Sequence, residues 1–278
     1  MAQTPLAEAA PTDWDQRARL ATLAALRRDD DLARDYVLKG GLVLQRVYGS
    51  PRASADIDLN HVQAHENALT DAHTAELQTV CDRLSVGLAE TAPAFGLAEA
   101  RLDVLKWSRL LPTVFAEVRY RAEGDAAEDG VAEGAVEVQI TLCERVCHTA
   151  LARIDRVPVL ASTLDDIVAD KLKVLIQQRR RHHVRSSDVY DLWFALVEAP
   201  FVPDPDVVRD ALLAKLASWP EYLPLMAGAF REPAVETFAE QGYRNLRAQQ
   251  PDLPFAPFDV VWREVQAFVD AMRLPESV

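Results

Sequence analysis

The segment KGGLVLQRVYGSPRASADIDLN (residues 39–60) decides how the chain is expected to fold. Two glycines follow the lysine that ends a short apolar run, and a second apolar run ends at a Gly-Ser-Pro break. Beyond the break the residues alternate, so that Ser54, Asp56 and Asp58 share one face of an expected strand and apolar residues share the other. The pattern predicts a strand, a glycine turn, a short helix and a second strand that carries two exposed carboxylates.

These two carboxylates suit a metal site. Asp56 and Asp58 are two residues apart, which corresponds to about 6.5–7 Å along an extended strand. Mg²⁺ takes one or two carboxylates and completes its shell with water and phosphate oxygens. Gly40 and Gly41 lie at the strand-to-helix turn, where glycine lets the backbone approach a ligand and helix-start N–H groups favour an anion. We therefore expect a triphosphate between the glycine turn and a metal on the aspartates.

The rest of the N-terminal half alternates between helical and strand patterns. Apolar residues at helical spacing predict helices over residues 13–30 and 64–90. Strands are expected over residues 36–39, 99–107, 113–121 and 134–142. In the last of these strands, Glu137 and Gln139 lie opposite the apolar face. A sheet with one apolar and one polar face is covered by helices on one side only, which leaves the polar face for chemistry.

The C-terminal half is predicted to be helical from about residue 162 to its end. The expected fold class is therefore α/β (α+β), with a mixed sheet in the first lobe and an all-helical second lobe. The expected divisions are a flexible tail (1–12), the α/β lobe (13–155) and the helical lobe (156–278). The acidic stretch 121–134 is expected to be a solvated loop.

Composition and charge limit the partners. The 278 residues carry a net charge of −13, which disfavours non-specific binding to nucleic acid because such binding depends on neutralising phosphates. The basic stretch QQRRRHHVR (177–185) still allows a local basic groove. We find no membrane-length apolar run and no secretory signal pattern. The three cysteines do not show the spacing of a disulfide framework, which fits a reducing compartment. Together with the lack of a membrane-length apolar run, this leads us to expect a cytoplasmic protein with no membrane partner.

Two blocks of the sequence resemble one known family. The pattern KGG…R-x-S-x-D-I-D resembles the signature of the AbiEii/AbiGii toxin-type nucleotidyltransferases, within the DNA polymerase β-like superfamily. The stretch DKLKVLIQQRRRHHVRSSDVYDL (170–192) resembles that family's lysine-bearing helix, Arg-rich segment and Asp-x-x-Asp-Leu helix. The resemblance covers about residues 35–195 and implies a nucleotidyltransferase fold for the first lobe.

The resemblance implies roles for individual residues in the first lobe. It implies metal binding by Asp56 and Asp58, and nucleotide binding by Lys39, Gly40, Gly41, Arg52 and Ser54. The alternative for Lys39 is a surface residue at a strand end.

In the second lobe, the resemblance implies that Lys171 contacts nucleotide phosphates as a point charge and that Asp188 completes the catalytic set. The alternatives for Lys171 are a solvated helix lysine, or replacement in this role by the neighbouring Lys173. For Asp191 we prefer a structural role, as a helix cap or as an Arg-paired residue that holds the two lobes together.

One position departs from the family pattern. Members of this superfamily usually supply a third carboxylate from a later strand, and the alignment places Gln139 there. Glu137 lies on the same face and is the alternative. Without either ligand, a second metal would be held more weakly.

The resemblance implies Mg²⁺-dependent (or Mn²⁺-dependent) transfer of a nucleoside monophosphate from an NTP to an acceptor hydroxyl. It further implies a tRNA 3′ end as acceptor, in some cases a protein hydroxyl, and the role of a toxin with a cognate antitoxin partner. An RNA backbone would be tracked by Arg179, Arg180, Arg181 and Arg185, which alternatively complement the dipole of a helix end. The alternatives are a small-molecule (antibiotic-type) nucleotidyltransferase and a non-catalytic nucleotide-binding module.

Overall fold

The computed structural model describes residues 13–123, 131–181 and 184–276, so the expected tail (1–12) and the middle of the acidic stretch lie outside the described residues. Seven strands form one mixed sheet in the order β3-β4-β5-β2-β1-β7-β6. The strands are β1 (Tyr36–Lys39), β2 (Ile57–His61), β3 (Glu99–Trp107), β4 (Thr113–Glu123), β5 (Val131–Thr141), β6 (Thr149–Ile154) and β7 (Val157–Ser162). The expected α/β class with a mixed sheet is confirmed.

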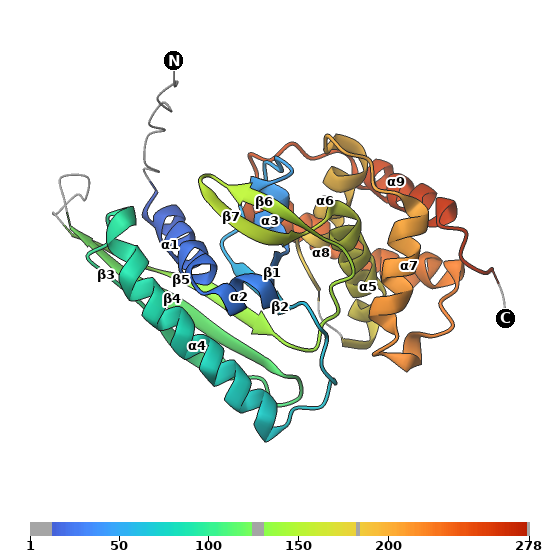
Figure 1. Ribbon diagram of the computed structural model, residues 1–278. Coiled ribbons are helices and arrows are strands. Elements are labelled where there is room, and N and C mark those ends of the chain that lie inside the picture. Colours follow the sequence, from blue (N-terminus) through green and yellow to red (C-terminus); the bar gives the residue numbers. More distant parts are fainter. Residues whose placement is uncertain (1–12, 124–130, 182–183, 277–278) are drawn as a thin grey trace, which may run out of the picture.

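The helices of the first half are α1 (Trp14–Arg28), α2 (Asp30–Asp35), α3 (Gly41–Arg46) and α4 (Asp71–Thr91). Those of the second half are α5 (Leu164–Arg181), α6 (Asp188–Trp193), α7 (Pro205–Leu216), α8 (Pro233–Gln249) and α9 (Phe258–Ala271). Helices α1 and α4 cover one face of this sheet, and helices α5 to α9 form a separate group beside it (Figure 1). Among the described residues, no helix is both long and apolar enough to cross a membrane.

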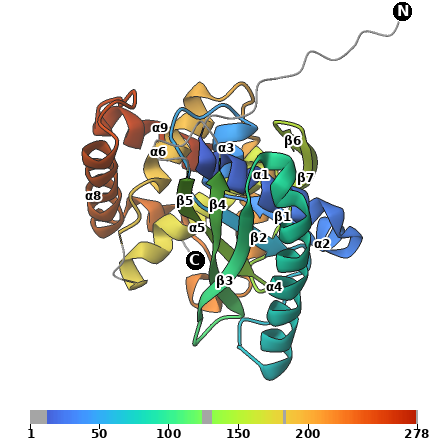
Figure 2. The same ribbon diagram turned by 90° about the vertical axis from the view of Figure 1, so that its left-hand side faces the viewer.

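The alternation of side chains explains why only one sheet face is covered by α1 and α4. In β5, Val136, Val138 and Ile140 are buried, whereas Glu137 is exposed. The two helices pack against each other and against the buried side, as the turned view shows (Figure 2). The opposite, polar face remains open toward the second half of the chain, as the pattern predicts.

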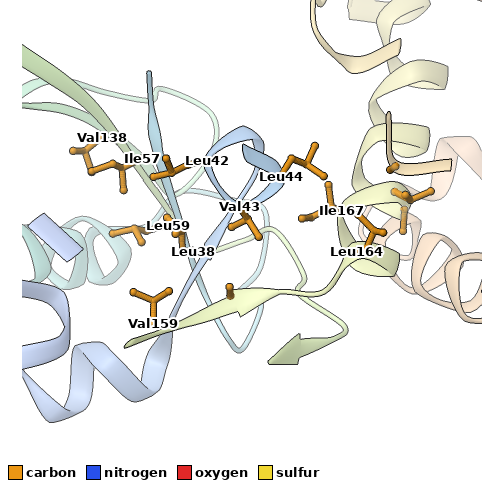
Figure 3. Close-up of a cluster of buried hydrophobic side chains, with 14 of the residues drawn as sticks. Leu38, Leu42, Val43, Leu44, Ile57, Leu59, Val138, Val159, Leu164 and Ile167 are labelled. Carbon is orange, nitrogen blue, oxygen red and sulfur yellow. The ribbon is translucent and has the colours of Figure 1, made fainter. Parts of the chain in front are cut away.

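Helix α3 links the sheet to the helical half. Its residues Val43 and Leu44 are fully buried, and Figure 3 shows Leu44 directed toward Leu164 and Ile167 on α5. Burying a leucine side chain contributes about 1.5–3 kcal/mol, so these contacts hold α5 firmly against the strand-turn-helix unit. The polar groups of α5 and α6 are thereby placed opposite β2.

Several boundaries differ from the sequence-based expectation. The expected division at 155/156 falls inside a hairpin, because β6 and β7 pair antiparallel and β7 joins β1 in the sheet. The exposed residues of β6 hide the alternating pattern that identifies a half-buried strand. Strand β2 begins at Ile57, not at residue 54, so Asp56 lies in the extended segment just before the strand.

Candidate active site

The predicted site residues from both halves of the chain line one cleft of about 210 Å³ between the start of β2 and helices α5 and α6. Ten of them are found there: Lys39, Gly40, Gly41, Arg52, Ser54, Asp56, Asp58, Lys171, Arg185 and Asp188. Residues more than 100 positions apart in the sequence therefore meet at the place where the polar sheet face is open.

The two glycines are required by close approaches on either side of the turn. Gly40 has φ 77°, a conformation that favours glycine, and a Cβ there would overlap the Asp58 carboxylate. A Cβ on Gly41 would lie 2.6 Å from Ser54 Oγ and would also overlap the Arg52 guanidinium. The glycine pair thus allows the aspartate strand and the R-x-S segment to close around one turn.

Asp56 and Asp58 stand apart from the other acids of the cleft because neither takes part in an ion pair or a side-chain hydrogen bond among the described residues. Burial raises the pKa of Asp58, and Asp56 adds to the effect, while Lys39 acts in the opposite direction. Desolvation, followed by Glu137, raises the pKa of Asp56. Two unpaired, adjacent carboxylate groups fit a hard divalent cation such as Mg²⁺.

The second pair of aspartates is neutralised by protein cations. Lys171 Nζ lies 2.7 Å from both Asp188 Oδ1 and Asp191 Oδ2. Arg52 binds Asp191 with two donors, at 2.6 Å from Nε and 3.0 Å from an Nη atom. Burial acts to raise the pKa of Asp188, but Lys171 and then Arg185 outweigh it and lower that pKa. The preferred interpretation of Asp191, an Arg-paired residue that joins the two halves, agrees with this contact.

These pairings bear on the residues expected to bind nucleotide. The Arg52 guanidinium is occupied by Asp191 and the Ala53 carbonyl, and Lys171 is buried between two aspartates. Lys39 forms an ion pair with Glu144 and is not an isolated surface lysine. The cations therefore line the cleft while being held in place by protein carboxylates.

A second buried network was missed by the sequence analysis. Glu144 contacts Lys39 and Lys173, and these cations hold its pKa well below the usual range. Asp170 lies 3.1 Å from Lys173 and 3.3 Å from Lys215 of α7. The sequence offered one signal, the acid Glu144 just after the expected strand 134–142. Nothing in the spacing identifies the partners of this acid.

The position expected for a third carboxylate is resolved by the strand register. Strands β2 and β5 pair in parallel, and Gln139 lies directly beside Asp58. Its amide donates to Thr141 Oγ1 at 3.3 Å. Glu137 is exposed and close enough to Asp56 to contribute to raising the pKa of that residue. Of the two residues considered, only Glu137 brings a carboxylate to this face.

A smaller cavity of about 190 Å³ adjoins the cleft on the side of the sheet. Asp56, Asp58 and Gln139 line both cavities, whereas Glu137 and Phe115 line only the smaller one. The two aspartates therefore lie between two spaces, one bounded by the glycine turn and helices, the other by strands β4 and β5.

The arginines expected to track RNA do not form one described cluster. Arg185 is half-exposed at the cleft, 3.5 Å from Asp188. Arg180 stacks over the Tyr222 ring, 4.9 Å from its centroid, in a different cavity. Arg179 and Arg181 belong to α5, but their side chains lie outside the described residues.

The cleft brings a glycine turn and two strand aspartates together with a lysine and an aspartate from the helical half. The family model described as "Nucleotidyl transferase AbiEii toxin, Type IV TA system" matches residues 23–271, and the chain belongs to this family. A comparison with curated protein sequences finds no match.

Two solved structures illustrate the distance to known relatives. JHP933 from Helicobacter pylori is similar at 15% identity and a TM-score of 0.43, over 85% of this chain and 94% of that one. An antigenic nucleotidyltransferase-like protein from Paracoccidioides brasiliensis is similar at 14% identity and a TM-score of 0.41, over 96% of this chain and 97% of that one. Since both TM-scores are below 0.5, family membership rests on the family model.

Proposed function

We propose that this nucleotidyltransferase moves a nucleoside monophosphate from an NTP to an acceptor hydroxyl, with pyrophosphate as the leaving group. The observation that carries the proposal is the unpaired state of Asp56 and Asp58 at the junction of the two cavities. A Mg²⁺ or Mn²⁺ ion held by these two carboxylates would neutralise phosphate charge and polarise the attacking oxygen.

The protein's own groups would position the nucleotide. Gly40 and Gly41 line the cleft beside Asp58 and would offer backbone N–H groups to a phosphate chain, and Ser54 adds a hydroxyl at the same turn. Arg185 and Lys171 present positive charge from the helical side, where it would offset charge developing on the pyrophosphate. Arg52 acts as a positioning residue, because its contacts with Asp191 fix the R-x-S segment.

The acceptor would enter the smaller cavity. Glu137 lies there beside Asp56 and would accept the proton of the attacking hydroxyl on a carboxylate oxygen. The Gln139 amide is neutral and donates a hydrogen bond to Thr141, so it would orient the acceptor and would not accept its proton. Of the two residues considered for the third carboxylate, Glu137 is therefore the one that we propose as the proton acceptor.

We further propose a tRNA 3′ end as the acceptor and a cognate antitoxin as the protein partner. The description of the family as a toxin of a toxin–antitoxin system supports the partner. Arg185 at the cleft mouth supports an acceptor that carries phosphates.

The test is transfer from each α-³²P-labelled NTP with Mg²⁺, using intact tRNA, periodate-oxidised tRNA without a free 3′ hydroxyl pair, and no RNA. We expect label on intact tRNA alone. Label on oxidised tRNA, or on the protein itself, would contradict the 3′-end acceptor. Bound NTP without any transfer would support a non-catalytic binding module.

The role of Glu137 has its own test with a matched control. Glu137→Gln is expected to lower transfer by about 10²-fold, the usual contribution of a general base. Glu133→Gln, an exposed acid on the same strand, should leave transfer unchanged. Equal rates for both variants would remove Glu137 from the mechanism.

A further inference from the structure

Three side chains that can bind a metal meet on the face of the sheet opposite the cleft. His61 ends β2, His65 follows in the connection, and Glu76 lies in the second turn of α4. One ligand atom from each lies within 4.8 Å of the others, and His65 Nε2 is 3.7 Å from Glu76 Oε1. Because Asp58 and His61 are three residues apart on one strand, their side chains leave opposite faces, and His61 lies on the side of Glu76 of α4.

Backbone groups contact the ring of His61 and that of the neighbouring His73. His61 Nδ1 is 2.8 Å from the carbonyl oxygen of Gln63. His73, whose ring packs against His65 at 5.3 Å, has its Nδ1 3.1 Å from the Ala68 carbonyl oxygen. His61 Nδ1 also lies 3.2 Å from the Gln63 N–H, and an ion bound at Nε2 would select the tautomer in which Nδ1 donates to the Gln63 carbonyl oxygen. Donation from the second ring nitrogen is the common support of a metal-bound imidazole.

Tyr36 provides an independent observation at the same place. Its ring packs edge-on against His61, with centroids 5.3 Å apart, and the two residues face each other in the β1–β2 register. The Tyr36 hydroxyl is buried and has no hydrogen-bond partner among the described residues. A buried hydroxyl without a partner calls for an explanation, and a water that completes the coordination of an ion at the cluster would supply one.

We propose that His61, His65 and Glu76 form a binding site for a divalent transition metal ion of the Zn²⁺ class. Two imidazole nitrogens and one carboxylate are a donor set that Zn²⁺ takes, whereas Mg²⁺ prefers oxygen ligands throughout. Ligand atoms in a tetrahedral site with bonds of about 2.0–2.1 Å lie about 3.3 Å apart, so the side chains close inward by a small movement. The ion joins the end of β2 to α4 and fixes the connection between them.

The site is distinct from the catalytic cleft in chemistry and in place. Asp56 and Asp58 offer oxygen ligands on the open face, and the histidine cluster offers nitrogen on the covered face. The chain would therefore bind two kinds of metal, one for chemistry and one for structure.

The test is a Zn²⁺ titration at pH 7.5, by competition with a chromophoric chelator, in the Asp58→Asn background so that the cleft contributes little. We expect one Zn²⁺ per chain with a micromolar or tighter Kd. His61→Gln, His65→Gln and Glu76→Gln should each weaken binding by at least about 100-fold, since each removes a ligand. His148→Gln, an exposed histidine elsewhere, is the matched control and should change nothing.

Thermal unfolding of the same variants provides the second measurement. Zn²⁺ should raise the Tm of the background chain, since it binds the folded state, and should not raise that of His65→Gln. Binding weaker than about 100 µM, or tight binding that survives all three ligand substitutions, would overturn the proposal.

Discussion

Two pairs of aspartates, at the cleft or in contact with residues that line it, have the same chemistry and opposite surroundings. Asp188 and Asp191 are buried and matched by Lys171 and Arg52, whereas Asp56 and Asp58 have no cationic partner within hydrogen-bond distance among the described residues. The surroundings lower the pKa of Asp188 and raise that of Asp58.

Burial alone therefore does not distinguish an acid that joins parts of the fold from an acid that is available to a ligand. A buried carboxylate whose charge is compensated by the protein joins two halves of the fold, and removing one partner leaves an uncompensated charge. A carboxylate left uncompensated in a cleft instead lowers the stability of the folded chain until a ligand neutralises it. On this basis we propose that Asp188 and Asp191 support the site and that Asp56 and Asp58 receive the ligand.

Substitution of Asp58 should separate activity from stability most strongly. Asp58→Asn is expected to lower transfer by about 10³–10⁴-fold, corresponding to about 4–5.5 kcal/mol of lost transition-state stabilisation. The Tm should not fall, because no protein partner loses a contact. Initial rates and thermal unfolding of the same preparation check this, and a Tm loss that matches the rate loss would speak against a ligand-binding role.

Substitution of Asp191, in contrast, should mainly lower the stability of the folded chain. Asp191→Ala leaves Arg52 and Lys171 without this partner, and we expect a loss of about 3–5 kcal/mol in the free energy of unfolding. The control is Glu240→Ala, which breaks an exposed helix pair with Arg244 and should cost about 0.3–0.5 kcal/mol. Urea unfolding of both variants gives the comparison, and equal losses would show that the buried pairing is not structural.

The glycine turn can be tested without changing any charge. Gly41→Ala places a methyl group against Ser54 and Arg52 and should cost about 1–3 kcal/mol through overpacking, with weaker NTP binding. Gly228→Ala is the control, because a Cβ there meets nothing within 4 Å. Calorimetric NTP binding and unfolding of the two variants measure the difference, and unchanged binding in Gly41→Ala would separate the turn from the nucleotide.

The pH dependence should reveal both pairs in one experiment. An ordinary aspartate has a pKa of about 3.9. The pKa of Asp58 is raised, so Asp58 loses its ionised form at a higher pH than an ordinary aspartate does. Asp188 has a lowered pKa, so its stabilising contribution is present above the unfolded value and is lost only as pH falls through the lower folded value. As pH falls from 7, kcat/KM should therefore decline before the Tm does. A simultaneous decline would contradict the assignment.

Local patterns in the sequence could predict the core of the site. The glycine pair and the R-x-S-x-D-I-D segment are contiguous, so their strand-turn-helix-strand arrangement follows from spacing, and the structure differs only by starting β2 at Ile57. The second block placed Lys171 and Asp188 because the family pattern links the two blocks.

Features that depend on distant partners could not be predicted. Glu144 lies 105 residues from Lys39 in the sequence, and no local spacing indicates that they meet. The β6–β7 hairpin was missed because its edge strand exposes Leu151 and lacks the alternation of a half-buried strand. Glu137 was expected on the same face as Gln139, but the pairing of Gln139 with Asp58 depends on the strand register, which local spacing does not give.

The most direct test of the account is a Mn²⁺ titration followed by electron paramagnetic resonance. It would use His65→Gln as background, so that the histidine cluster does not contribute, and compare this chain with His65→Gln carrying Asp58→Asn. The account predicts Mn²⁺ binding at one or two sites in the first chain, tightened by NTP, and its loss in the second. Equal Mn²⁺ binding by both chains would contradict the claim that Asp56 and Asp58 are left unpaired to receive a metal.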